Sequence, residues 1–224
     1  MILTSEPPKT ARQKRGNLPV LSVSTWSDFQ AQSRPIEDAI LWQRFLPKAV
    51  QDWLDQIPET RLPSARYRLK PVDVGFCLAK VFGDAGHPGD PALSWLSQDV
   101  GRLAHLVADI NGVSSVRLRI EPVFDNACRR FHVDNVVCRL ICTYRGPGTQ
   151  LSLHPGKMDE IETISTGAPI LLKGKQWPQG DSIGLHHRSP PIEGTGLSRL
   201  VLVLDPVHED DEIGTSYDRR FIPN

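Results

Sequence analysis

Residues 131–144 read FHVDNVVCRLICTY, and this stretch predicts both a strand and the start of a functional site. His132 and Asp134 lie two residues apart, directly before a run of mostly apolar residues. Side chains at positions i and i+2 of a strand point to the same face. Because an imidazole and a carboxylate on one face can occupy adjacent positions around a metal ion, the stretch predicts a metal site.

A third ligand is expected from residues 184–191, GLHHRSPP, where His186 and His187 are neighbours. Neighbouring residues of a strand face opposite ways, so only one of the two can point toward the site. Two histidines and one carboxylate on one side of a metal leave its other side open, as in non-haem Fe(II) oxygenases. We therefore predict a mononuclear metal site formed by His132, Asp134 and one of these histidines.

The same stretch predicts which other side chains share the face of the site. If residues 132–144 are extended, the even-numbered residues point inward together with the metal ligands. A β-bulge near Asn135 would alter this arrangement. Without a bulge, the inner face consists of His132, Asp134, Val136, Cys138, Leu140, Cys142 and Tyr144.

The composition of the 224 residues, 39% hydrophobic and 23% charged, is typical of a globular protein. Lys+Arg and Asp+Glu are both 26, so the net charge is zero, which argues against a dedicated nucleic-acid or membrane binder. No apolar run reaches the roughly 20 residues of a membrane span, and the N-terminal residues lack a signal-peptide core. The four cysteines form no CxxC pair, so a reducing, cytoplasmic location is expected.

Three segments have the apolar spacing of helices. In residues 36–57 we expect two helices separated at Pro47, because proline removes a backbone donor and obstructs the preceding turn. A weaker helical pattern covers residues 72–82. The clearest helix covers residues 90–111, with an N-cap aspartate, a proline at its first position and a glycine directly after its end.

After residue 112 the pattern changes to that of strands. Apolar and charged residues alternate over 116–121, which predicts a half-buried strand. Residues 197–205, LSRLVLVLD, are apolar on both faces and predict a central strand. Further strands are expected at 18–23, 136–144, 169–172 and 183–187.

Helices followed by strands predict an α+β domain in which N-terminal helices pack on a jelly-roll, cupin-like β core. We expect a disordered tail over residues 1–18 and a single domain over 19–224. Within that domain we expect a mainly helical layer over 19–112, the β core over 113–206 and a loose tail over 207–224.

The HVDN sequence, the strand ending in tyrosine, the distal histidine and the arginine of a later strand resemble Fe(II)/2-oxoglutarate-dependent dioxygenases, particularly the prolyl-hydroxylase branch. His187 follows Asp134 by 53 residues, and Arg199 follows His187 by 12, close to the spacing in that family. This resemblance covers about residues 131–204. It implies a double-stranded β-helix core, with Fe(II) and 2-oxoglutarate as cofactors and O₂ as oxidant.

The same resemblance implies roles for Arg199 and Tyr144. Arg199 would pair with the far carboxylate of 2-oxoglutarate, and Tyr144 would contact that carboxylate. An arginine within an apolar strand is costly to bury without an anionic partner, and its fork matches a carboxylate. A salt bridge to an acidic residue, or exposure at a strand edge, is the alternative for Arg199.

Over most of its length the chain more closely resembles DUF1826, a bacterial family of proteins of unknown function. The match favours His187 over His186 as third ligand and implies no established activity. The residues that carry it are FHVDN at 131–135, CTYRGPGT at 142–149, LLKG at 171–174 and HRSPP at 187–191.

Other residues offer different sites. Cys128, Cys138 and Cys142 could form a zinc site with a histidine, although small buried apolar side chains are the simpler interpretation. Cys128, His132 and Asp134 could form a hydrolase triad, but they are closer in sequence than such triads usually are.

We therefore predict an oxygenase that uses Fe(II) and the small-molecule co-substrate 2-oxoglutarate, with His132, Asp134 and His187 as metal ligands. The alternative is a non-catalytic metal-binding protein on the same fold, such as a zinc-handling or stress-related protein. A third interpretation is an interaction protein in which the HxD pair is structural. The substrate does not follow from the sequence.

Overall fold

The computed structural model describes residues 13–14, 17–31, 37–178, 182–208 and 219–220, in which helices and strands are mixed along the chain. The strands are β1 (Gln13–Lys14), β2 (Val20–Val23), β3 (Ala39–Trp42), β4 (Ala65–Leu69), β5 (Ser115–Val123), β6 (Cys138–Arg145), β7 (Gln150–Ser152), β8 (Glu162–Thr163), β9 (Ile170–Lys173), β10 (His186–Arg188), β11 (Arg199–Val207) and β12 (Arg219–Arg220). The helices are α1 (Trp26–Ala31), α2 (Lys48–Gln56), α3 (Val74–Asp84) and α4 (Pro91–Asn111), with 3₁₀ turns at Glu59–Arg61, Pro71–Asp73 and Met158–Glu160.

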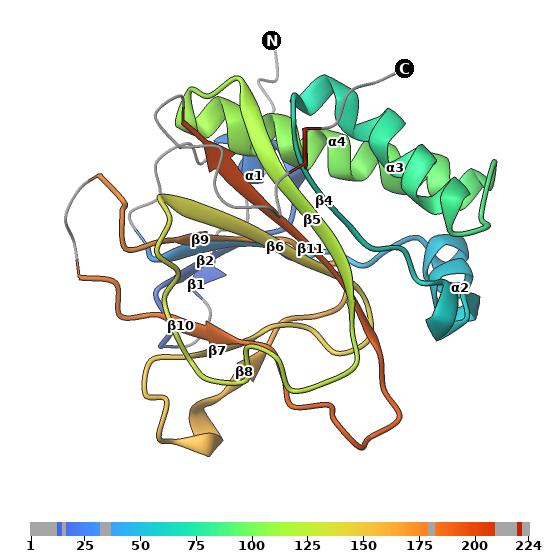
Figure 1. Cartoon of the computed structure of the whole chain (residues 1–224). Coiled ribbons are helices and arrows are strands. Elements are labelled where there is room, and N and C mark those ends of the chain that lie inside the picture. The colour runs from blue at the N-terminus through green and yellow to red at the C-terminus, as the bar shows by residue number, and fades with distance from the viewer. Residues whose placement is uncertain (1–12, 15–16, 32–36, 179–181, 209–218, 221–224) are drawn as a thin grey trace, which may run out of the picture.

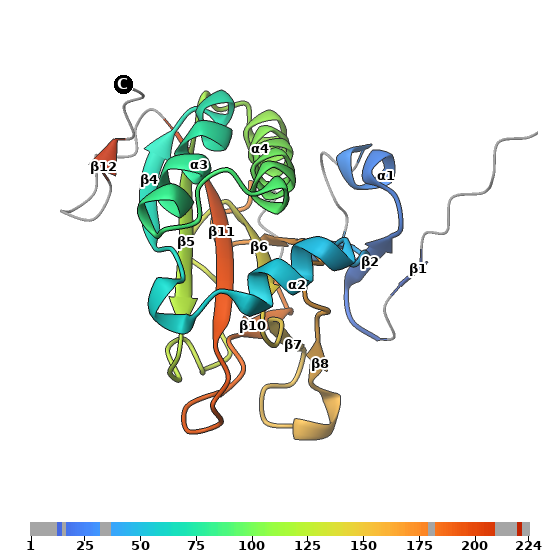
Figure 2. The same ribbon diagram turned by 90° about the vertical axis from the view of Figure 1, so that its right-hand side faces the viewer.

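The described strands form two sheets of unequal size (Figure 1). The larger has nine strands in the order β1-β2-β3-β9-β6-β11-β5-β4-β12, and the smaller has three in the order β10-β7-β8. Helices α3 and α4 lie side by side on one face of the larger sheet (Figure 2). The smaller sheet lies on the opposite side of the larger one, so the large sheet is the middle layer.

The central strand β11 is buried over its whole length, as predicted for residues 197–205. It pairs antiparallel with β5 on one side and with β6 on the other, and all nine of its residues are buried. Its even-numbered leucines pack with α3 and α4. Val201 and Val203 face the other way, toward the smaller sheet. One strand therefore contributes to the core on both sides of the sheet.

Local sequence signals explain the helices that are confirmed. α4 begins after Asp90, whose carboxylate accepts a backbone hydrogen bond at 2.7 Å, and ends before Gly112, which has a φ of 62°. α3 corresponds to the pattern at 72–82, and α2 to the part of 36–57 after Pro47. None of the helices in the described ranges is both long and apolar enough to cross a membrane.

The predicted helix before Pro47 is wrong, because residues 39–42 form β3. All four residues of β3 are buried, and the strand pairs with β2 and β9. A short apolar run that is buried on both faces lacks the alternation of a strand and resembles a helix segment. The expected helical layer over 19–112 is also incomplete, since β2, β3 and β4 come from it and join the larger sheet. Residue 36 lies outside the described residues.

The two predicted tails lie largely outside the described residues. Of residues 1–18, residues 13–14 and 17–18 are described, and 13–14 form β1, which pairs antiparallel with β2. Of residues 207–224, residues 207–208 and 219–220 are described; Val207 ends β11, and 219–220 form β12, which runs parallel to β4. Both ends of the larger sheet are therefore extended by short strands from the ends of the chain.

The side-chain orientation predicted for residues 132–144 is wrong. β6 begins only at Cys138, because the preceding backbone bonds to residues 174–176; the Lys175 N–H, for example, donates to the Asp134 carbonyl at 2.9 Å. Alternation therefore does not continue from the loop into the strand. The even-numbered residues Cys138, Leu140, Cys142 and Tyr144 pack with the helices, and Arg139, Ile141 and Thr143 point to the opposite side.

On the helix side, Tyr144 joins a buried network centred on Asp99 of α4. Asp99 accepts two hydrogen bonds of 2.5 Å from Arg44 and one of 2.7 Å from the Tyr144 hydroxyl, and Arg102 donates two more. Burial by itself would raise the pKa of Asp99, but these hydrogen bonds outweigh burial and hold the pKa below its usual value. Tyr144 therefore fixes α4 to β6 and does not face the site.

We expect Asp99→Asn to reduce the free energy of unfolding by about 3–5 kcal/mol at pH 7, because it leaves Arg44 buried without its carboxylate. Urea unfolding measures this change. Since the pKa of Asp99 is lowered by folding, its contribution is present above the unfolded pKa of about 3.9 and is lost as the pH falls through the folded pKa. The difference between variant and wild type should therefore shrink only in acid.

Asp84→Asn is the matched control, because Asp84 forms an exposed ion pair with Lys80. This change should leave the free energy of unfolding nearly unchanged. Equal losses in the two variants would contradict a dominant role of the buried network.

Candidate metal and anion site

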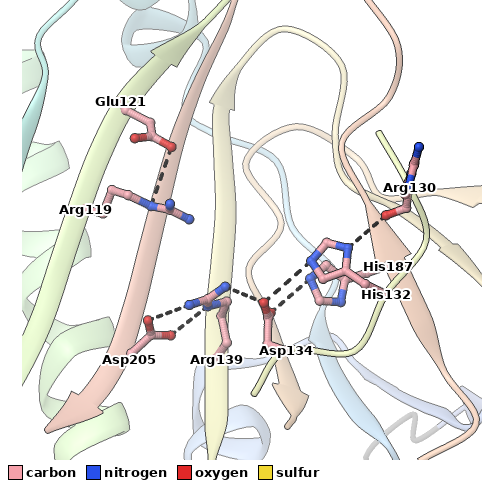
Figure 3. A network of polar contacts seen from close by, with 8 residues as sticks. All are labelled: Arg119, Glu121, Arg130, His132, Asp134, Arg139, His187 and Asp205. Atoms are coloured by element: carbon pink, nitrogen blue, oxygen red, sulfur yellow. Dashed lines mark hydrogen bonds and ion pairs between the residues drawn. The ribbon is translucent and has the colours of Figure 1, made fainter. Parts of the chain in front are cut away.

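His132, Asp134 and His187 converge between β6 and the smaller sheet (Figure 3). One donor atom of each residue lies within 4.8 Å of the others. His187 Nε2 lies 3.0 Å from Asp134 Oδ2, and His132 Nε2 lies 3.5 Å from Asp134 Oδ1. The three side chains could hold a metal ion from one side.

Backbone pairing fixes the two histidines relative to each other. His132 and His187 exchange two N–H···O=C hydrogen bonds, both 3.0 Å long, and form an isolated β-bridge. His132 Nδ1 lies 2.8 Å from the Arg130 carbonyl oxygen. Because a carbonyl oxygen only accepts, Nδ1 carries the hydrogen, and Nε2 is left with its lone pair directed toward Asp134. This is the tautomer that a metal ligand needs.

Asp134 is held by Arg139 through one of its two oxygens. Arg139 donates to Asp134 Oδ1 at 2.6 Å and to both oxygens of Asp205 on β11 at 2.7 Å (Figure 3). Oδ2 is buried and, among the described residues, takes part in no hydrogen bond of good geometry, despite the nearby His187. A buried carboxylate oxygen without a hydrogen bond, beside two imidazoles, fits a divalent metal ion.

The charges of these groups also suit a metal. Burial lowers the pKa of His187, which favours the neutral imidazole. The contact with Asp134 raises the pKa of His132. Burial would raise the pKa of Asp134, but its contacts with both histidines and the charge of Arg139 outweigh burial and hold the pKa well below its usual value. An ionised carboxylate is the form that binds metal, and metal competes with protons for the imidazoles.

Arg199 is the largest fully buried side chain, and its guanidinium has only neutral partners within the described part of the chain. It donates to the Pro147 carbonyl at 2.7 Å, to Ser189 Oγ at 2.7 Å and to Thr143 Oγ1 at 3.1 Å. Burial lowers the pKa of Arg199 to about 10. A buried cation without a carboxylate is costly, and an anionic ligand would compensate it.

A single cavity joins the two groups. It holds about 540 Å³ of empty space, its open mouth included, and both histidines and Arg199 line it. Its wall between them is aliphatic, formed by Ile141, Val201 and Val203. A ligand with an acid group at one end could therefore reach from Arg199 to the candidate metal position along an apolar surface.

Of the two neighbouring histidines, His187 is the one at the cluster. It is buried, whereas His186 is half-exposed and places Nδ1 2.9 Å from the Gly184 carbonyl oxygen. Tyr144 lies on the opposite face of β6, so the structure does not bring it to Arg199. The predicted contact between Tyr144 and a co-substrate carboxylate is therefore wrong, because the loop before β6 reverses the expected alternation of side chains.

The cysteine alternatives do not come together in the structure. Cys138 and Cys142 are buried on the helix side, and burial raises the pKa of each thiol to about 12. Cys128 is exposed and lines the cavity on the other side of the sheet. A triad with Cys128 is also disfavoured, because His132 directs one ring nitrogen to a backbone carbonyl and the other to Asp134.

Sequence reasoning missed four residues that support the site. Arg139 and Asp205 hold Asp134, and Thr143 and Ser189 hold Arg199. Within the sequence, the local signal for these residues was that charged residues occur in otherwise apolar strands, and this signal does not identify which residue each of them contacts.

The family model for proteins of unknown function (DUF1826) matches residues 24–205. The chain belongs to this family. The resemblance inferred from the motifs is thus confirmed, and three of the four motifs of this DUF1826 protein supply residues that line the cavity. FHVDN and HRSPP supply the candidate ligands and Ser189, and CTYRGPGT supplies Thr143 and Pro147 to Arg199. LLKG ends at Gly174, which contacts the loop that carries Asp134.

No protein of curated function matches this DUF1826 sequence. Its structure is similar to the rice dioxygenase for auxin oxidation, with a TM-score of 0.45 and 13% identity over 78% of this chain and 75% of that one. For the 2-oxoglutarate complex of the Arabidopsis thaliana dioxygenase for auxin oxidation 1, the TM-score is 0.47 and the identity 10%, over 90% of this chain and 100% of that one. For a full-length Neurospora crassa protein, solved in complex with alpha-KG, the TM-score is 0.41 and the identity 14%, over 89% of this chain and 88% of that one.

We expect Gly174→Ala to displace the loop of this DUF1826 protein that carries Asp134. A Cβ atom at residue 174 would clash with the Val136 carbonyl oxygen, so one of the two backbones must move. The free energy of unfolding should fall by about 1–3 kcal/mol, as in other overpacked sites. Urea unfolding measures the loss, and hydrogen exchange should increase at residues 133–137.

Gly156→Ala is the matched control, because a Cβ atom there meets nothing within 4 Å. It should leave both measurements unchanged. If Gly174→Ala changed neither the free energy of unfolding nor the hydrogen exchange, the tight contact between the two loops would be contradicted.

Proposed function

We propose that the protein is a mononuclear non-haem Fe(II)- and 2-oxoglutarate-dependent oxygenase. The observation that carries this proposal is the single cavity with a two-histidine, one-carboxylate cluster at one end and the buried Arg199, which has no carboxylate partner among the described residues, at the other. A dicarboxylate co-substrate satisfies both ends, because one acid group can reach the metal while the other compensates the guanidinium. The two facing sheets also support the jelly-roll core that such a function implies.

Each residue has a defined task in this proposal. His132, Asp134 and His187 hold Fe(II) from one side and leave its remaining positions open. Arg199 orients 2-oxoglutarate, with Ser189 and Thr143 fixing its fork. When bound, Fe(II) and 2-oxoglutarate supply the oxidising chemistry with O₂. The aliphatic wall of the cavity excludes water from the space between them.

Anaerobic titration with Fe(II) and 2-oxoglutarate tests this function. We expect a visible charge-transfer band in the wild type that requires both additions. Arg199→Met should weaken the binding of 2-oxoglutarate about 10- to 100-fold, because a charged hydrogen bond is worth about 1.5–3 kcal/mol, while metal binding persists. Asp134→Ala should abolish the band by removing the metal.

Arg145→Met is the control, since Arg145 lies on β6, the strand that pairs with the strand of Arg199, but donates to the carbonyls of Leu54 and Ile57 away from the cavity. It should leave the band unchanged. Tight binding of Zn(II) by the wild type, without any band on adding Fe(II) and 2-oxoglutarate, would overturn the oxygenase and support a non-catalytic metal-binding protein.

We also expect Arg139→Met to weaken metal binding about 10- to 100-fold, as the loss of other groups that orient metal ligands does. The change frees Asp134 to rotate and leaves Asp205 without its partner. Titration of the metal-free protein with Co(II) measures the affinity, and its visible absorbance reports the coordination. Arg139→Lys should restore neither the affinity for Co(II) nor the absorbance, because an ammonium cannot hold two carboxylates in a planar fork. Full restoration by lysine would contradict the orienting role.

A further inference from the structure

The face of β4 and β5 beside the cavity carries four arginines, which we call the arginine block. In the register of these strands, Arg66 lies directly opposite Arg119, and Arg68 lies directly opposite Arg117. Directly opposite residues share a face of the sheet. Arg119 lines the cavity, so the whole block faces the side of the candidate site.

This part of the sheet is not covered by the smaller sheet. The apolar cluster beneath the smaller sheet includes side chains of β3, β9, β6 and β11 but none from β4 among the described residues. The side chain of Arg66 is 39% exposed and that of Arg119 is 27% exposed. Arg119, which extends from β5 in Figure 3, lines the cavity together with Arg139. The side chains of Arg66 and Arg119 are therefore accessible, and Arg119 connects the arginine block to the cavity.

Carboxylates on this face are fewer than guanidinium groups. The described residues of β4, β5 and β11 place two acids here, Glu121 and Asp205. Glu121 lies 3.5 Å from Arg119 and 3.7 Å from Arg66, and both distances exceed a normal hydrogen bond. Asp205 directs both oxygens to Arg139 and lies directly opposite Arg117 in the strand register, so the arginines of the block farthest from its charge are Arg66, Arg68 and Arg119. Like charges directly opposite each other are destabilising, so the arrangement favours binding of an anion.

The geometry selects the kind of anion. Residues two apart on a strand are separated by roughly 6.7 Å, and opposite residues by about 5 Å, so the long side chains of Arg66, Arg68 and Arg119 can reach one group. A carboxylate has two oxygens and is satisfied by one guanidinium fork. A phosphate has three free acceptor oxygens and a charge near −2. All four residues are arginine, which binds phosphate through its fork, whereas lysine acts as a point charge.

We propose that the arginine block binds a phosphate group of the molecule that enters the cavity. With its phosphate on the block, the rest of that molecule extends past Arg119 toward His132 and His187. Its role as the substrate rests on the proposed oxygenase function, whereas the binding of phosphate does not. The phosphate can belong to a small molecule or to a nucleic-acid backbone.

Calorimetric titration of the metal-free protein with inorganic phosphate, at constant ionic strength, tests the block independently of the oxygenase. All samples carry Arg199→Met, so that Arg199 cannot bind the anion. We expect the further pair Arg66→Gln and Arg68→Gln to weaken phosphate binding at least about tenfold. The same comparison without Arg199→Met keeps the test valid if that change impairs folding.

Arg129→Gln with Arg130→Gln is the matched control, because both residues are exposed near the cavity and the same charge is removed. Phosphate affinity should be unchanged. Without phosphate, the β4 double variant should melt at the same temperature as the parent protein or higher, since repulsion is relieved. A purely structural block would instead lower the melting temperature.

Residues 209–212 read EDDE, so the titration is repeated on a chain in which they are replaced by QNNQ to exclude competition. Absence of phosphate binding in both chains overturns the proposal, as does equal binding by the β4 double variant. A nucleoside monophosphate and a short single-stranded oligonucleotide then distinguish the sources. Tighter binding of the oligonucleotide with a steeper salt dependence assigns a nucleic-acid backbone, and preference for the monophosphate assigns a small molecule.

Discussion

The rest of the structure depends on two charged side chains that are buried near the ends of the central strand β11. Arg199 and Asp205 share one face of a strand that is otherwise apolar, so each needs compensation within the fold. Asp205 is compensated by Arg139, which continues to Asp134 and thereby ties a candidate ligand to the core. Arg199 meets neutral oxygens within the described part of the chain, which leaves a cationic position at the far end of the cavity. The strand that holds the larger sheet together therefore also defines both ends of the site.

The two faces of strand β6 have different roles, because its successive side chains point to opposite sides of the sheet. On one side, Tyr144 joins Asp99 and the helices in a buried network that stabilises the layers. On the other side, Arg139 and Thr143 hold groups of the cavity. Because each set has its own face, a change to the cavity wall need not disturb the contacts between helices and sheet.

Signals confined to one segment could be read from the sequence, and signals between distant segments could not. α4 and β11 follow from capping residues and from a run apolar on both faces. The cluster of His132, Asp134 and His187 follows from residue type and spacing, and the structure brings these three residues together. The role of Arg199 as a buried cation was also anticipated from its apolar strand, although its neutral partners were not.

The failures have a common physical cause. The orientation of Tyr144 depends on where β6 begins, and that is set by hydrogen bonds to residues 174–176, far along the chain. β3 is a strand only because β2 and β9 cover its edges, while its own residues suit a helix equally well. Arg139 needs Asp205, which lies 66 residues away. Pairings at such separations leave no trace in local periodicity.

The backbone bridge between His132 and His187 has a consequence for metal selection. Since main-chain hydrogen bonds hold the two imidazoles together, the ligand geometry exists before any ion arrives. Capture then requires no folding step, and the intrinsic preference among first-row ions follows the Irving–Williams order, in which Fe(II) ranks below Cu(II) and Zn(II). Which ion would occupy such a preformed site therefore depends on supply, that is, on the concentrations of free metal that the surroundings of the protein maintain, as well as on the ligands themselves.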